Sequence, residues 1–184
     1  MATYQHGISI QEQATSLVPT IEVSVGLPVV IGTAPLHLVN APVTELPINK
    51  ATLIYNYNEA VANFGYDEDW ENYTLCEYMD AAFSKNSISP VVFVNVLDIT
   101  KHKQSVESTQ KTVTDKEVIL TDPVILNTLK IKKEDAGEYL TYETDYTASY
   151  NEDNQVVINI LNEEITDHIY VEYDKVDPTQ IDET

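Results

Sequence analysis

Residues 91–97 are the most strand-like segment of the chain, and they constrain its fold more than any other feature. They read Val-Val-Phe-Val-Asn-Val-Leu, so almost every position is apolar and no polar face alternates with an apolar one. A strand of this kind is typical of the centre of a parallel sheet, where other elements cover both faces. The segment therefore predicts a layered α/β core around it.

Two helices are predicted ahead of this strand. The first is expected to begin at Asn58, a favourable N-cap, and to end at Gly65, which can adopt the left-handed conformation common after a helix. The second opens with Thr74 and Glu77 in capping-box spacing, where each side chain accepts a hydrogen bond from a free backbone N–H. An apolar stripe at helical spacing follows and would face the core. Its members are Leu75, Tyr78, Met79, Ala82 and Phe83.

Two more strands are predicted in the same part of the chain. Residues 29–31 form a short apolar run between Pro28 and Gly32, which suits a strand buried on both faces, and residues 51–55 are β-prone. Three strands and two helices are few for a doubly wound fold. We therefore infer that the α/β core over residues 21–98 is partial: either the rest of it is missing from this sequence, or a second unit interrupts it.

The character of the sequence changes after Asp98. Residues 99–116 are polar and are predicted to be a linker, and residues 117–176 are predicted to form an all-β domain resembling a sandwich or a barrel. Residues 151–154 read as the turn of a hairpin, and residues 177–184 as an exit linker. The expected strands cover residues 117–121, 124–132, 138–150, 155–161 and 168–173. The predicted class is therefore mixed α and β.

Residues 1–20 contain no helical pattern and are predicted to be an extended arm. Apolar or aromatic side chains alternate there with polar ones, which indicates a half-buried strand. The alternating residues are Tyr4, His6, Ile8 and Ile10. Such a strand at the end of a chain can join the sheet of its own domain, or it can add to a sheet edge of a neighbouring molecule.

Charge excludes some classes of partner. The chain has a net charge of −20, with 30 acidic residues, ten lysines and no arginine, so a groove that follows nucleic-acid phosphates or an anionic membrane surface is not expected. Residues 1–66 carry four acidic residues and one lysine, so most of the charge lies in residues 67–184. No apolar run approaches the roughly 20 residues needed to cross a bilayer, and no secretion signal is expected at the start.

No catalytic motif is found. The five glycines are not in the spacing of a phosphate-binding loop, and the four histidines, at positions 6, 37, 102 and 168, are too scattered to pair as metal ligands. Asp67, Asp69 and Glu71 have the spacing of the first calcium ligands of an EF-hand, but Asn72 and Tyr78 stand where that loop needs Gly and Glu. We therefore expect no metal, no cofactor and no enzymatic activity. The alternative, an enzyme on the α/β core, would require a deep pocket beyond residue 97 into which acidic or histidine side chains converge.

Two residue types have a structural and a functional interpretation. Cys76 adjoins the apolar stripe of the second helix, which favours a buried, inert thiol over a reactive one. The 12 tyrosines are dense between residues 139 and 173. Strand propensity accounts for most of them, but exposed tyrosines would point to a β-rich binding or adhesion module.

Short motifs follow one another through residues 7–103. They are residues 7–10 (GISI) with Glu12, residues 25–35 (VGLPVVIGTAP), residues 49–50 (NK) with residues 58–66 (NEAVANFGY), residues 73–77 (YTLCE) with residues 81–83 (AAF), residues 90–98 (PVVFVNVLD), and residues 101–103 (KHK). Together and in this order, they resemble the contractile tail sheath family of phages and phage-tail-like bacteriocins. Subunits of that family are normally longer than this chain.

The resemblance implies a structural subunit. Sheath subunits polymerise around a rigid inner tube, and extended arms add strands to the sheets of neighbouring subunits. Contraction of the polymer drives the tube through a bacterial envelope without nucleotide consumption at that moment. The implied partners are other sheath subunits and the inner tube protein, and the implied location is a virion tail or tail-like particle assembled in the bacterial cytoplasm. The β-rich domain is expected on the outside of the sheath.

Overall fold

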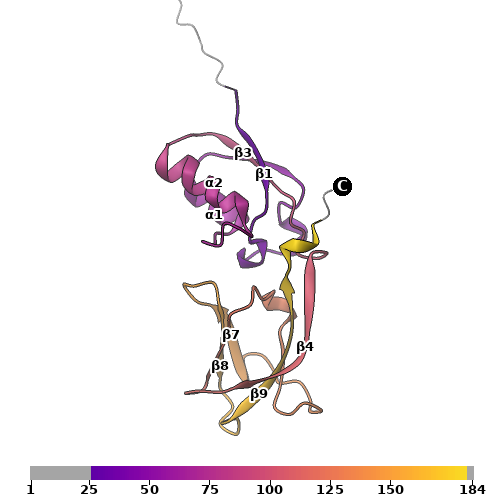
Figure 1. Cartoon of the computed structure of the whole chain (residues 1–184). Coiled ribbons are helices and arrows are strands. Elements are labelled where there is room, and N and C mark those ends of the chain that lie inside the picture. Colours follow the sequence, from indigo (N-terminus) through magenta and orange to yellow (C-terminus); the bar gives the residue numbers. More distant parts are fainter. Residues whose placement is uncertain (1–25, 182–184) are drawn as a thin grey trace, which may run out of the picture.

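The computed structural model describes residues 26–181, which form an α/β unit and a β-rich unit (Figure 1). The chain is thus a mixed α and β fold, as the sequence predicts. The α/β unit consists of β1 (Val29–Gly32), β2 (Ala51–Ile54), α1 (Tyr57–Phe64), α2 (Thr74–Met79) and β3 (Val91–Asn95). The β-rich unit consists of β4 (Lys103–Thr112), β5 (Glu117–Leu120), β6 (Lys130–Lys132), β7 (Tyr146–Tyr150), β8 (Val156–Ile160) and β9 (His168–Val176). α2 continues directly into a π-helical segment at Asp80–Lys85, and short 3-10 turns lie at Leu36–Leu38, Val43–Glu45, Leu126–Thr128 and Pro178–Gln180.

The sheet of the α/β unit has the order β1-β3-β2, so β3 is the central strand, as predicted. β1 is parallel to β3, and β2 is antiparallel to it. Both helices lie on one side of this sheet (Figure 1). The predicted burial of residues 29–31 on both faces is wrong. Within residues 26–181, β1 is an edge strand, and Val29 and Ile31 are 61% and 68% exposed because neither α1 nor α2 covers the second face.

The ends of α1 depend on local side chains. Asn56, and not the predicted Asn58, is the N-cap: its side chain accepts a hydrogen bond from the backbone N–H of Glu59 at 2.9 Å. The helix ends at Gly65, as predicted, with φ at +74°. A side chain at this glycine would also meet the backbone oxygen of Pro35, since an added Cβ would lie 2.6 Å from it.

A tertiary contact replaces the capping box predicted for α2. The Thr74 hydroxyl accepts a hydrogen bond from the backbone N–H of Thr33 at 3.1 Å, and the Thr33 hydroxyl accepts one from the N–H of Thr74 at 3.0 Å. No side chain caps the helix in the predicted way. The reciprocal pair ties the start of α2 to the end of β1, so the prediction failed because a long-range partner competes for the same hydroxyl.

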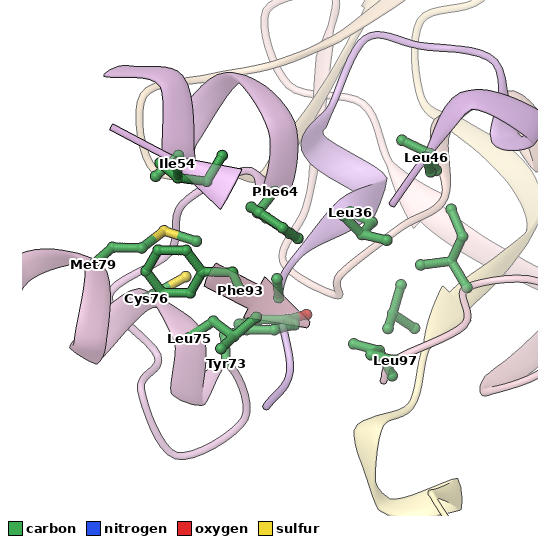
Figure 2. Close-up of a cluster of buried hydrophobic side chains, with 14 of the residues drawn as sticks. Leu36, Leu46, Ile54, Phe64, Tyr73, Leu75, Cys76, Met79, Phe93 and Leu97 are labelled. Carbon is green, nitrogen blue, oxygen red and sulfur yellow. The ribbon is translucent and has the colours of Figure 1, made fainter. Parts of the chain in front are cut away.

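Phe93 on β3 is the centre of the first hydrophobic core. Its ring lies 5.9 Å from that of Phe64 on α1, and 6.1 and 6.0 Å from those of Tyr78 and Phe83 (centroid distances). Figure 2 shows this ring among side chains from the strands and both helices. The apolar stripe predicted for the second helix packs into this cluster, and Cys76 beside it is fully buried. Burial raises the pKa of the Cys76 thiol to about 11, which agrees with an inert thiol.

The β-rich unit has two antiparallel sheets, of order β4-β9-β6 and β5-β8-β7. A second hydrophobic core takes side chains from both sheets, among them Ile131, Ile169, Leu120 and Ile158. Each sheet therefore covers the inner face of the other.

Three predictions in this region need correction. The polar segment expected to be a linker over residues 99–116 contains β4, which pairs along its length with β9. Its side chains are mostly exposed, so no apolar period marks it, and the backbone pairing makes it a strand. The strands expected over residues 124–132 and 138–150 shrink to β6 and β7, because turns occupy the rest. The hairpin with its turn at residues 151–154 is confirmed, joining β7 to β8.

The chain leaves the α/β unit and returns to it at neighbouring points. Leu97 and Val176 belong to the same hydrophobic core. The two crossing segments also bond to each other, because the backbone N–H of Asp177 donates to the carbonyl oxygen of His102 at 3.0 Å. Ile181 then packs against the core of the α/β unit. The β-rich unit therefore projects from the α/β unit on two adjacent segments (Figure 1).

Candidate functional site

The most conspicuous surface feature of the described chain is the side of the β1-β3-β2 sheet that carries no helix. Strand register places its side chains in two rows, each crossing all three strands. The first row consists of Val29, Val92 and Leu53, and the second of Ile31, Val94 and Ala51. All six are apolar and uncharged. We call these six residues the open face.

Burial alternates along each strand and defines which side is open. Val91 and Phe93 of β3 and Ile54 of β2 are fully buried under the helices. On the opposite side, Val92 and Val94 are half-buried, while Leu53 is 40% exposed. Leu27 and Tyr55 continue the same alternation just beyond β1 and β2, and both are exposed.

Exposed apolar surface of this kind needs an explanation. Single apolar side chains are common at protein surfaces, but contiguous patches of a few hundred Å² usually mark an interaction site. A parallel strand pair is normally covered on both faces, and here β1 and β3 are covered on one. The open face therefore has the properties of a surface that binds another layer of polypeptide.

The open face also lies in the least charged part of the chain. Between residues 26 and 66 the only ionisable acids are Glu45 and Glu59, and the only lysine is Lys50. Elsewhere the excess of acidic residues makes the surface repel other copies of the chain. An uncharged patch is therefore the surface on which two copies approach at the lowest electrostatic cost.

The predicted inter-subunit residues Tyr4, His6, Ile8 and Ile10 lie outside the described residues. The sheet that such an arm would join is described. Its outer strands, β1 and β2, have no further strand on their outer sides within residues 26–181. Edges of this kind present free backbone N–H and C=O groups to an added strand.

The histidines have separate local roles. The ring of His37 lies between those of Tyr73 and Tyr150, with centroids 6.0 and 6.2 Å away, and its Nδ1 has no hydrogen-bond partner. Burial lowers the pKa of His37 to about 4. His102 Nδ1 accepts a hydrogen bond from the backbone N–H of Asp98 at 3.0 Å. His168 stands on β9.

The acidic run before α2 is engaged in turn formation. Asp67 accepts a hydrogen bond from the N–H of Asp69, and Asp69 accepts bonds from the backbone and side-chain N–H groups of Asn72. Within residues 26–181 no three His, Cys, Asp or Glu side chains are grouped to hold a metal ion. Beyond Leu97, the carboxylate of Asp98 accepts hydrogen bonds from the N–H and hydroxyl of Thr100.

Asn95 is a structurally important polar residue whose role the sequence did not reveal. It is fully buried at the end of β3. Its side-chain oxygen accepts hydrogen bonds from the N–H groups of Ala34 and Leu97, at 2.9 and 3.2 Å, and its amide donates to the Leu97 carbonyl at 2.8 Å. The only hint in the sequence was one amide in an otherwise apolar strand.

The tyrosines of the β-rich unit fall into three groups by burial, and Tyr150 and Tyr170 are half-buried. Tyr146 and Tyr173 are buried, as strand residues of a core would be. Tyr139 and Tyr142 are 51% and 53% exposed. Tyr142 lies at a hollow of about 700 Å³ between the two units, whose other walls are mainly aliphatic side chains.

Comparison with family models, curated proteins and solved structures found no match in any of the three. In the described part of the chain, neither helix is long and apolar enough to cross a membrane.

Proposed function

We propose that this chain is a structural subunit of a contractile tail sheath, which assembles around an inner tube and contracts to drive it through a bacterial envelope. The observation that carries the proposal is the open face. The motifs that resemble the sheath family run through residues 7–103, and this range includes all three strands of the sheet that bears the face. Assembly would make use of a surface that is otherwise unfavourable in water.

Burial of the open face would supply a substantial driving force. Apolar surface contributes roughly 25 cal/mol for each Å² removed from water, so burying roughly 400 Å² contributes about 10 kcal/mol before the costs of association. Part of that contribution offsets the repulsion between copies that each carry a net charge of −20. Such an interface suits a lattice whose contacts change during contraction.

The proposed partners are other copies of the subunit and the inner tube protein. Arms formed by residues 1–20 would add strands to the free edges at β1 or β2 of a neighbour. The acid-rich β-rich unit would face outward, away from the tube. The particle would be a virion tail or a tail-like bacteriocin assembled in the bacterial cytoplasm.

Assembly is tested by comparing two equally drastic substitutions. Ile31→Lys places a charge in the open face, and Ile119→Lys places one at a 49% exposed position on β5. We expect the unmodified chain and Ile119→Lys to form rings or hollow tubes as concentration rises, and Ile31→Lys to stay monomeric. Sedimentation velocity and negative-stain microscopy measure both. A monomeric unmodified chain, or tubes formed by Ile31→Lys, would contradict assembly through the face.

The arm and the sheath identity have their own tests. Deleting residues 2–16 should abolish the polymer and leave the monomer folded. Normal tubes formed by the truncated chain would contradict the arm hypothesis. Assemblies without a central channel would contradict a sheath even if the open face mediates them.

A second candidate is a β-rich binding or adhesion module, favoured by the exposed ring of Tyr142 at the hollow between the units. Exposed aromatic rings beside a concave apolar surface are common in carbohydrate and protein recognition. A glycan array probed with the chain and with Tyr142→Ala tests it. Binding that disappears in the variant would support this candidate, and no binding by the unmodified chain would remove it.

A further inference from the structure

The two units touch at a second place, far along the chain from the segments that join them. The turn of the β7–β8 hairpin reaches back to the α/β unit. There the side-chain amide of Asn154 donates one hydrogen bond to the carbonyl oxygen of Tyr66, at 3.1 Å, and another to the carboxylate of Asp67, at 2.8 Å. Both protons of one amide are therefore used across the boundary between the units.

The position of Asn154 in the turn suits this contact. Its φ is +59°, a conformation that asparagine adopts more readily than most residues. Asn151 organises the turn, because its side-chain oxygen accepts hydrogen bonds from the N–H groups of Asp153 and Gln155. The turn is thus held by Asn151, which leaves the Asn154 side chain free to reach the other unit.

Few apolar contacts reinforce the Asn154 contact. The two units have separate hydrophobic cores, and the side chains that join the first core from beyond residue 103 are Ile125, Val176 and Ile181. A hollow of about 480 Å³ beside Asn154 is lined by residues of both units, and the hollow of about 700 Å³ beside Tyr142 is lined by both as well. The units are therefore not packed together over a continuous surface.

Tyr150 makes a weaker second contact. Its hydroxyl lies 2.7 Å from the carbonyl oxygen of Val124 and 3.1 Å from that of His37. The hydroxyl has one proton, and the shorter contact stays within the β-rich unit. Hydrogen bonding across the boundary therefore depends mainly on Asn154.

We propose that Asn154 is a latch that fixes the orientation of the β-rich unit relative to the α/β unit, and that opening it lets the β-rich unit swing about the two joining segments. The joining segments act as the hinge, since the chain crosses between the units there, and the hydrogen bond from the N–H of Asp177 to the carbonyl oxygen of His102 keeps the two segments side by side. The latch bonds the Asp67 carboxylate at a hollow that is also lined by Asp69, Asp122, Asp153, Asp177 and Lys175, so it is sensitive to a change of charge. This inference goes beyond the proposed sheath function and does not depend on it.

The sharpest test changes one atom. Asn154→Asp keeps the size and the turn preference of the side chain, but it replaces two donors with an acceptor that faces the Asp67 carboxylate. The rescue variant adds Asp67→Asn, which restores one donor–acceptor pair in reverse. The matched control is Asn162→Asp, because Asn162 donates to Asp145 at 2.8 Å wholly within the β-rich unit.

Pulsed electron spin resonance between labels on the two units measures the orientation. Suitable sites are Lys85→Cys and Glu163→Cys, whose side chains are 69% and 90% exposed, in a Cys76→Ala background. We expect one narrow distance distribution for the unmodified latch, a distribution at least twice as wide for Asn154→Asp, and a narrow one again with Asp67→Asn. The distribution of the control should stay narrow, and circular dichroism should show that the three variants are folded like the unmodified latch.

Three outcomes would overturn the proposal. They are an unchanged distribution in folded Asn154→Asp, a broad distribution before any change to the latch, and equal broadening in the Asn162→Asp control. In the last case the added charge would act on the β-rich unit itself and not on the contact between the units.

Discussion

The outer surfaces of the two units are built in opposite ways. In the β-rich unit the sheet that contains β9 carries charged pairs on its surface, such as Lys132 with Glu172 at 2.6 Å and Lys175 with Asp122 at 3.4 Å. In the α/β unit the side of the sheet away from the helices carries only the apolar residues of the open face. Each unit nevertheless has a separate hydrophobic core, although Ile125 and Val176 of the β-rich unit join the core of the α/β unit.

The difference shows in which unit the apolar faces of the sheets are covered and in which unit one apolar face is left in contact with water. Two sheets that cover each other bury their inner faces, and on the outer sides exposed apolar side chains such as Ile119 are interspersed with polar ones, so the β-rich unit needs no further layer. A parallel strand pair with helices on one side leaves half of its apolar surface in water. The comparison therefore places the expected binding function on the α/β unit. Substitutions and a change of pH test whether the two units differ in this way.

Phe93→Ala should destabilise the α/β unit by about 3–5 kcal/mol, because it leaves a cavity among three aromatic rings. The separate cores predict that the β-rich unit keeps its structure. Hydrogen exchange resolved by unit measures this, with Ile158→Ala as the reciprocal change in the second core. If Phe93→Ala lowers protection equally in both units, the cores are one cooperative structure and the comparison fails.

Acid should weaken the chain first at the junction of the units, through His37. Its pKa is about 4 in the folded protein against 6.5 for the free side chain, so between these values the unfolded chain holds the proton. The free energy of unfolding therefore falls as pH drops from 6.5 towards 4, by up to about 3 kcal/mol for this group. Urea denaturation across that range should show a smaller fall in His37→Leu. Parallel curves for the two proteins would rule out this role.

Asn95→Ala should cost the α/β unit about 1–3 kcal/mol, because the N–H of Ala34 would lose its buried acceptor. Thermal unfolding of the variant measures the loss. Asn127→Ala, at an amide in the β-rich unit for which no side-chain hydrogen bond is found, is the comparison variant. Equal losses of stability in both variants would mean that the hydrogen bonds of Asn95 contribute no more to stability than the side chain of Asn127 does.

Ile31→Lys should change the stability of the monomer by less than about 0.5 kcal/mol, since its side chain is 68% exposed. Ile119→Lys should have a similarly small effect. Urea denaturation at a concentration low enough to keep both variants monomeric measures this. A loss of several kcal/mol in Ile31→Lys alone would show that the open face belongs to the core of the monomer, and its assignment as a binding surface would be wrong.

Features governed by short-range rules were predictable from sequence. The helix end at Gly65 follows from the left-handed conformation of glycine, and the turn at residues 151–154 follows from a cluster of turn-forming residues between two strands. The central position of β3 followed from its apolar composition. The candidate site was less accessible: the sequence suggested an incomplete core, but it assigned burial on both faces to residues 29–31.

Long-range partners decided the remaining features. β4 is a strand because β9 pairs with it, and Thr74 bonds to Thr33 because folding brings β1 beside α2. The open face exists because neither helix crosses to that side of the sheet, and the Asn154 contact because the hairpin reaches a residue 87 positions away. Local sequence thus determined the end of α1 at Gly65 and the hairpin turn at residues 151–154, whereas the tertiary structure decided how α2 begins and which surfaces are covered, because both depend on partners distant in the chain.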